Sequence, residues 1–362
     1  MPSPHPDASP AERRGAPAPR ALSWALLVGL LALVALFMFS DVRELWQTAA
    51  AIDLRMLAVP FLLTIASYAT MARSYEGIAN AAGAAVTFTE MFRITLVANT
   101  VNYIVTSGGL SGFAVRVFFF VRMRIHPGKA VIISLTQTFL TNLVLLFCIA
   151  VGFLYLLRTK ELGAYAFTAM SILLTFSLAA ATLATLLLLH RQLRRRVLFV
   201  MAEWTNAFLH RFFPARKPAR VRLWRFQRNL NRGIEFLLSR KREMVVPTLW
   251  IVVDWTATLA ILYVAFLAVG HPVPIQVVMV GFSIGVTLSL ISLVPGGLGI
   301  MEGSMAAVFT GFAVPLEKSL VAVLLFRVAY YVFPTVIAVF FFRHMLVAGT
   351  REAPDILGDD LV

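Results

Sequence analysis

The chain has 362 residues, of which 59% are hydrophobic and 14% are charged, and its mean hydropathy is +0.82. An average soluble domain carries about 25% charged residues, so this composition excludes a soluble enzyme. The apolar segments are unbroken runs of about 20 residues, whereas the strands of a membrane β-barrel alternate over about 10. The sequence therefore predicts an all-α polytopic membrane protein.

The net charge of +14 is concentrated in one segment. Residues 190–243 contain fifteen Lys or Arg and three acidic residues, which is a net charge of +12. A dense basic loop between apolar runs is the positive-inside signal of a cytoplasmic loop, so a nucleic-acid partner is not expected. Aromatic residues interleaved with these arginines suit helices on an anionic membrane face. A topology determinant alone explains the loop equally well.

In chain order, residues 1–20 contain six prolines and read as a disordered cytoplasmic tail. Apolar runs then predict six full spans, at 21–40, 54–72, 130–157, 164–189, 245–269 and 316–342. We expect a single membrane domain over 21–345, with halves 21–157 and 164–345, followed by a C-terminal tail at 346–362.

Two further apolar stretches are interrupted by glycines. Residues 94–121 are broken at 106–112, and a basic cluster follows them. A full crossing here would place this cluster and the later basic loop outside, against the positive-inside rule. Residues 275–312 are broken at 295–299, and the second leg is too short to span about 30 Å at 1.5 Å per residue. Each stretch is therefore predicted to be a re-entrant hairpin, the first from the cytoplasm and the second from outside.

The two halves follow the same order, with two spans, a hairpin and a span. Gly108-Gly109-Leu110 and Gly296-Gly297-Leu298 are 188 residues apart, and the flanking spans keep similar offsets. Because the halves have opposite orientation, this predicts an inverted-topology repeat, the arrangement of many transporters. The alternative is coincidence, since glycine pairs are common in membrane helices.

Irregular backbone at membrane depth must be buried in protein or line a wet cavity, so both breaks are expected to line one central cavity. Four charges lie within the spans and hairpins, and each is either a functional group or half of a structural ion pair. The predicted substrate-binding residues are Asn102, Gly108, Gly109, Gly112, Arg116, Asp254, Pro295, Gly296, Gly297, Gly299, Glu302 and Arg327.

Other glycines and polar residues have a simpler interpretation. Gly281 and Gly285 are better explained by close helix packing. Two polar stripes at helical spacing either face the cavity or hydrogen-bond across helices. They are Thr95, Asn99, Asn102 and Thr106, and then Ser134, Gln137, Thr138, Thr141 and Asn142.

Enzyme signatures are weak. The G-x-S-x-G match at 281–285 lies in an apolar span rather than at a strand-to-helix turn. No P-loop is present, the six histidines show no metal spacing, and Cys148 is the single cysteine. We therefore expect no enzyme activity, no cofactor and no metal.

The run from Val294 to Glu302, with Gly311, Leu325-Phe326-Arg327, Tyr330-Tyr331 and Pro334, resembles a signature of the lysylphosphatidylglycerol synthetase transmembrane-region family. That family includes the flippase region of bacterial phosphatidylglycerol lysyltransferases. Asn102, Ser107-Gly108-Gly109, Gly112 and Arg116 resemble its looser first motif, although many members have proline where Thr106 or Ser107 stands. The tail after Met345 has no room for the soluble synthase domain of the full-length enzymes.

The resemblance implies a flippase-like protein of the bacterial inner membrane, with both termini cytoplasmic. It would translocate an anionic or aminoacylated phosphatidylglycerol-type lipid or a related polar lipid. Arg116 and Arg327 would hold phosphate, while Asp254 or Glu302 would balance a cationic headgroup or carry a proton. The alternatives are a membrane-embedded transferase and a non-transporting partner of a separate lipid-modifying enzyme. Oligomers are possible under each interpretation.

Overall fold

The computed structural model describes residues 41–52, 54–105, 109–159, 164–197, 199–200, 234–235, 239–292 and 294–350. These residues form helices and turns, and none of them forms a β-strand. The predicted tail 1–20, the predicted span 21–40, Gly108 and most of the basic loop lie outside the described residues. The chain is an all-α polytopic membrane protein, as its composition predicted.

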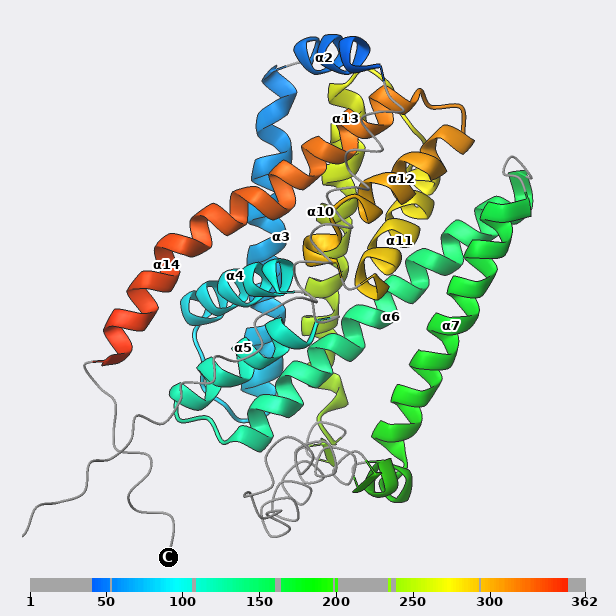
Figure 1. Cartoon of the computed structure of the whole chain (residues 1–362). Coiled ribbons are helices and arrows are strands. Elements are labelled where there is room, and N and C mark those ends of the chain that lie inside the picture. The colour runs from blue at the N-terminus through cyan, green and yellow to red at the C-terminus, as the bar shows by residue number, and fades with distance from the viewer. Residues whose placement is uncertain are drawn as a thin grey trace, which may run out of the picture.

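Figure 1 shows the helices in their spatial arrangement. In chain order they are α2 (Val42–Ala50), α3 (Leu54–Ala81), α4 (Phe88–Ile104), α5 (Leu110–Arg122), α6 (Pro127–Thr159), α7 (Ala164–Leu189), η1 (Lys241–Met244), α10 (Val245–Ala268), α11 (Ile275–Ile291), η2 (Pro295–Gly297), α12 (Ile300–Gly311), α13 (Leu316–Arg327), η3 (Val328–Val332) and α14 (Phe333–Thr350).

Five helical segments are long and apolar enough to cross a membrane. They are Met56–Ala81, Pro127–Thr159, Met170–Leu187, Arg242–Ala268 and Leu316–Phe341. Each coincides with one of the predicted spans, so the multi-pass architecture is confirmed for the described part of the chain. The division into tails, membrane domain and basic loop stays a prediction.

Helix α3 extends past the predicted span 54–72 and ends at Ala81. Tyr75 and Ile78 in this extension are buried, so packing prolongs the helix beyond its apolar run. The segment between the first two predicted spans contains helix α2. The Asp41 side chain caps its first turn by accepting a hydrogen bond from the Arg43 amide (2.8 Å).

The last predicted span is also less regular than expected. Residues 316–342 form α13 and α14 with a π-helical turn, Val328–Val332, between them. Such turns are rare and are frequent at functional sites. This one begins directly after Arg327 and carries Tyr330 and Tyr331.

Both glycine-interrupted stretches fold as helical hairpins. Helix α4 packs against α5, and α11 packs against α12. Helices α5 and α12 have 13 and 12 residues, so each is roughly 20 Å long, which is too short to cross the hydrocarbon core. The packing role of Gly281 is confirmed, because a Cβ there would lie 2.5 Å from the Phe309 ring of α12. The depth of the hairpins in the bilayer stays a prediction.

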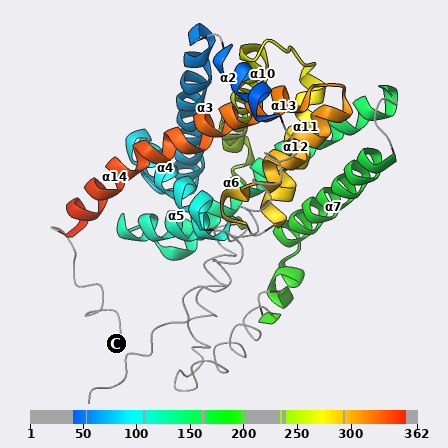
Figure 2. The ribbon, with the colours of Figure 1, turned by 45° about the horizontal axis from the view of Figure 1, so that its top comes forward.

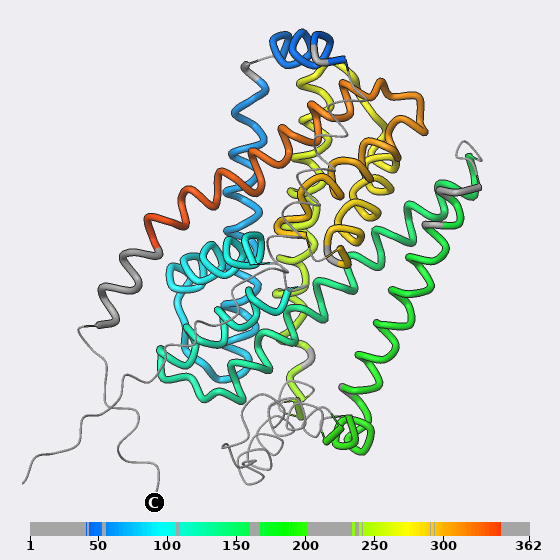
Figure 3. Tube along the Cα trace, in the orientation of Figure 1, coloured from blue at the N-terminus to red at the C-terminus, as the bar shows by residue number. Residues whose placement is uncertain are grey.

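Helices α3 and α10 pack along one another near the centre of the molecule and run in opposite directions (Figure 1). The α4–α5 and α11–α12 hairpins lie in different halves of the molecule, as the trace in Figure 3 shows. The two are in contact, because η2 at the turn of the second hairpin contacts α4. Helix α7 lies at the edge of the molecule, which the turned view in Figure 2 also shows. This arrangement is compatible with an inverted repeat, which stays a prediction.

Candidate functional site

A cavity of about 540 Å³ lies between the hairpins and the central helices. Pockets for small ligands commonly enclose about 300–1,000 Å³. Its walls come from α3, α4, α5, α6, α10, α11 and the π-helical turn. Gly109 from the first glycine break and Gly296 and Gly297 from the second both line it. The two breaks therefore meet at one cavity, as the sequence predicted.

The first hairpin contributes Arg116. Helix α5 starts after Gly109, whose φ of +93° suits glycine, and Arg116 follows about two turns later. Its Nη1 donates a hydrogen bond to Asn99 Oδ1 of α4 (3.2 Å), and its Cζ lies 5.2 Å from the centroid of the Tyr75 ring. Its Nε is buried and has no hydrogen-bond partner among the described residues. Arg116 thus lines the cavity with its charge beside a neutral amide and an aromatic ring.

The central helices contribute Asp254. This residue lies in α10, lines the cavity and is 4% exposed. Its Oδ1 accepts a hydrogen bond from the Ser67 hydroxyl of α3, and Ser67 lies 3.3 Å from the Thr258 hydroxyl. Both neighbours are neutral. The Thr258 hydroxyl donates to the main-chain carbonyl of Asp254, so Ser67 is the carboxylate's hydrogen-bond partner in the described part of the chain. A buried carboxylate held by one neutral hydroxyl is electrostatically costly and invites a cationic partner.

The second hairpin carries a buried ion pair. Arg327 Nε of α13 lies 2.7 Å from Glu302 Oε1 of α12. Arg327 Nη2 also donates to the carbonyl oxygens of Gly296 (2.7 Å) and Gly297 (3.0 Å). We call these four residues the Arg327 clamp. It fastens the turn of the second hairpin to α13 and pairs the two charges within the protein, while Glu302 Oε2 is buried without a hydrogen-bond partner among the described residues.

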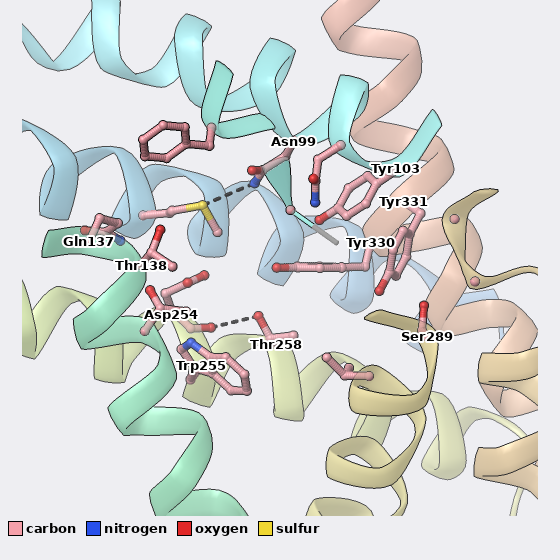
Figure 4. A pocket seen from close by; sticks show the side chains of 18 of the residues that line it. Asn99, Tyr103, Gln137, Thr138, Asp254, Trp255, Thr258, Ser289, Tyr330 and Tyr331 are labelled. Atoms are coloured by element: carbon pink, nitrogen blue, oxygen red, sulfur yellow. Dashed lines mark hydrogen bonds between the residues drawn. The ribbon is translucent and has the colours of Figure 1, made fainter. Parts of the chain in front are cut away.

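Aromatic side chains form much of the remaining wall. Tyr103 of α4 and Tyr331 of the π-helical turn have ring centroids 4.4 Å apart. Figure 4 shows Tyr330 extending into the space between Asn99 and Thr258. Trp255 lines the cavity beside Asp254. Such rings can hold an organic cation through their π faces.

The rim of the cavity includes exposed apolar side chains. Leu110 at the start of α5 is 70% exposed, and Leu135 of α6 is 43% exposed, yet both line the cavity. In a membrane-spanning protein, exposed apolar side chains are compatible with lipid. The polar interior and the apolar rim together match a ligand with a polar head and hydrocarbon tails.

The family model for the lysylphosphatidylglycerol synthase TM region matches residues 22–338. The chain belongs to this family. It is also 23% identical over 185 residues to a UPF0104 membrane protein of Methanothermobacter thermautotrophicus, covering 50% of this chain and 53% of that protein.

Shorter matches link the chain to phosphatidylglycerol lysyltransferases. The identity is 34% over 85 residues for the Staphylococcus haemolyticus protein and 35% over 86 residues for a Staphylococcus aureus protein. Each match covers 24% of this chain and 10% of the enzyme. The chain thus spans about half of the archaeal relative and about a tenth of the lysyltransferases.

The cavity gathers part of the predicted family site. Six predicted residues line it, namely Asn102, Gly109, Arg116, Asp254, Gly296 and Gly297. Five do not line it and are buried nearby in the hairpins or α13, namely Gly112, Pro295, Gly299, Glu302 and Arg327. Gly112 packs the first hairpin, because a Cβ there would lie 2.9 Å from both the Ala98 carbonyl oxygen and Asn102 Cβ. Gly108 lies outside the described residues.

The polar stripes divide between the cavity and the helix interior. Asn99, Gln137, Thr138 and Thr141 line the cavity. Thr95 and Ser134 are fully buried instead, and Asn142 bonds back to the Thr138 carbonyl (2.9 Å). Sequence reasoning missed Tyr75, Tyr103 and Trp255, because aromatic residues are frequent on membrane helices and carry no positional signal. No cluster of three His, Cys, Asp or Glu side chains suitable for a metal occurs in the described part of the chain.

Proposed function

We propose that the protein moves a phospholipid between the leaflets of the bacterial inner membrane. The headgroup would pass through the cavity while the acyl chains remain in lipid. One observation carries the proposal: both glycine breaks line a single cavity that has a polar, charged interior and an exposed apolar rim. Interrupted helices facing such a site are typical of transporters.

Residue roles follow from which charges remain available. Arg116 lines the cavity, has no ionic partner among the described residues and is proposed to contact the lipid phosphate. The Arg327 clamp is proposed to position the second hairpin rather than to contact lipid, since its charges already satisfy one another. No chemical step is required of the protein in this proposal, and a lipid-modifying enzyme would act separately. Both termini are proposed to be cytoplasmic.

Purified protein in liposomes tests this function. The vesicles would contain a phospholipid labelled on an acyl chain, and a membrane-impermeant quencher would report its exposure in the outer leaflet. We expect faster loss of the protected inner-leaflet signal than in protein-free vesicles. The Arg116→Gln variant should reduce the rate, while Arg122→Gln should not, because Arg122 lies on the same helix and does not line the cavity. Rates equal to those of empty vesicles would refute the proposal.

A further inference from the structure

The charges of the cavity define the charge pattern of its ligand. Arg116 and Asp254 are the two charged residues among those that line it. The other charged pair at this depth, Glu302 and Arg327, is joined in the Arg327 clamp. The cavity therefore presents one cationic group and one anionic group.

Neither of these groups has an ionic partner in the described part of the chain. Arg116 is bonded to the neutral amide of Asn99, and Asp254 is bonded to the neutral hydroxyl of Ser67. Within the described part of the chain they do not pair with each other either. Desolvated charges without counter-ions are costly. A ligand that supplies both counter-charges should therefore bind most tightly.

We propose that the cavity selects a zwitterionic headgroup with one phosphodiester and one primary ammonium. This inference rests on the proposed function. The phosphodiester accepts hydrogen bonds from the Arg116 guanidinium, whose planar donors suit phosphate oxygens. The ammonium donates to the Asp254 carboxylate and lies against aromatic rings of the wall, including Trp255 and Tyr330.

Other headgroups leave one charge unsatisfied. A purely anionic headgroup pairs with Arg116 but brings no partner to Asp254, and its own charge is repelled there. A headgroup with a second ammonium brings a cation for which the cavity offers no further carboxylate. Discrimination by unpaired buried charge is strong, because leaving one partner of such a pair unmatched is costly.

Transport of matched lipids tests the selectivity. The probes are phosphatidylethanolamine, its N-acetyl derivative and phosphatidylglycerol, each labelled on an acyl chain. We expect the protein to move phosphatidylethanolamine at least about 30-fold faster than the other two, the low end of the effect of an unmatched buried charge. Equal rates for all three, or a faster rate for phosphatidylglycerol, would overturn the inference while leaving the transport function intact.

Two variants assign the charges to their partners. Asp254→Asn should abolish the advantage of phosphatidylethanolamine over its N-acetyl derivative, because the variant neither pairs with the ammonium nor repels the anionic headgroup. Arg116→Gln should slow all three lipids. The matched controls are Glu76→Gln and Arg122→Gln, which change charges on α3 and α5 that do not line the cavity. Unchanged lipid preference in a folded Asp254→Asn protein would overturn the role of that carboxylate. If a variant does not fold, the rates of the three lipids with the unsubstituted protein decide whether the inference holds.

A binding measurement separates recognition from transport. Short-chain forms of the same three lipids would be added to the purified protein, and its melting temperature would be measured. We expect phosphatidylethanolamine to raise the melting temperature most. In the Asp254→Asn variant, the three lipids should raise it equally. If no lipid moves faster than in empty vesicles but this preference appears, the transport function fails and the recognition site stands. Without a preference in either assay, the recognition site fails.

Discussion

The two hairpins share a glycine break but use their charged residues differently. At the second break, Glu302 lies in the first turn of α12 and is joined to Arg327, which also holds the carbonyls of the turn. At the first break, α5 has no acidic residue in its first turn. Among the described residues, the Arg116 guanidinium contacts a neutral amide and an aromatic ring and forms no ion pair. The arginine of the second hairpin forms a structural ion pair, whereas the arginine of the first has no ionic partner among the described residues. The role of an arginine beside a broken membrane helix, structural or ligand-binding, therefore depends on whether a carboxylate lies next to it.

Loss of the Arg327 clamp should have the largest effect. Arg327→Ala leaves the buried Glu302 carboxylate unpaired, which costs about 3–5 kcal/mol, and frees the carbonyls of the turn. We expect a lower melting temperature and poor accumulation in membranes. Glu302→Gln should cost less, because its amide removes the buried charge and keeps a hydrogen-bonding group. A stable Arg327→Gln protein that has lost lipid movement would show instead that Arg327 contacts the lipid.

The glycines of the two turns should respond unequally to alanine. Gly297 has a φ of +62°, and a Cβ there would overlap the Ser289 side chain of α11. Gly109 has a φ of +93°, but no atom lies within 4 Å of the position of its Cβ. Both substitutions carry backbone strain of about 1–3 kcal/mol, and Gly297→Ala adds the clash. The melting temperature of Gly297→Ala should therefore be lower than that of Gly109→Ala. The reverse order would mean that the second turn is not fastened as described.

Arg116 should affect transport rather than stability. Arg116→Gln keeps an amide that can bond to Asn99 and removes the charge beside the cavity. We expect a melting temperature close to that of the parent protein and lipid movement reduced about tenfold, the scale of a lost charged contact. Arg116→Lys should restore only part of the rate, since an ammonium lacks the planar fork. A large loss of stability in Arg116→Gln would show that Arg116, like Arg327, holds its hairpin in place.

The smallest perturbation tests the opposite orientation of the hairpins. Single cysteines would replace His126 and Pro274 in a Cys148→Ala background, and both positions are exposed while Cys148 is buried. We expect an impermeant thiol reagent to reach position 126 from the cytoplasm and position 274 from outside, with little change in transport. Labelling of position 126 from outside would refute the predicted topology.

Much of the architecture was readable from the sequence. Apolar runs marked the five long helices now described, and the glycine breaks marked both hairpins. The length of α3 past its predicted span was not foreseen, because burial of Tyr75 and Ile78 extends the helix beyond its most apolar part. The helix α2 and the π-helical turn after Arg327 were also missed. These features depend on capping and packing rather than on hydropathy.

The sequence by itself determined the class of protein, the position of its spans and the two broken segments, because hydropathy, length and glycine content are local properties of the chain. Only the tertiary structure decided which charges pair. Glu302 and Arg327 are 25 residues apart and form an ion pair, while Ser67 and Asp254 are 187 residues apart and share a hydrogen bond. Contacts of this kind depend on how distant helices pack. That packing satisfies Arg327 within the protein and leaves Arg116 and Asp254 beside the cavity without ionic partners in the described part of the chain.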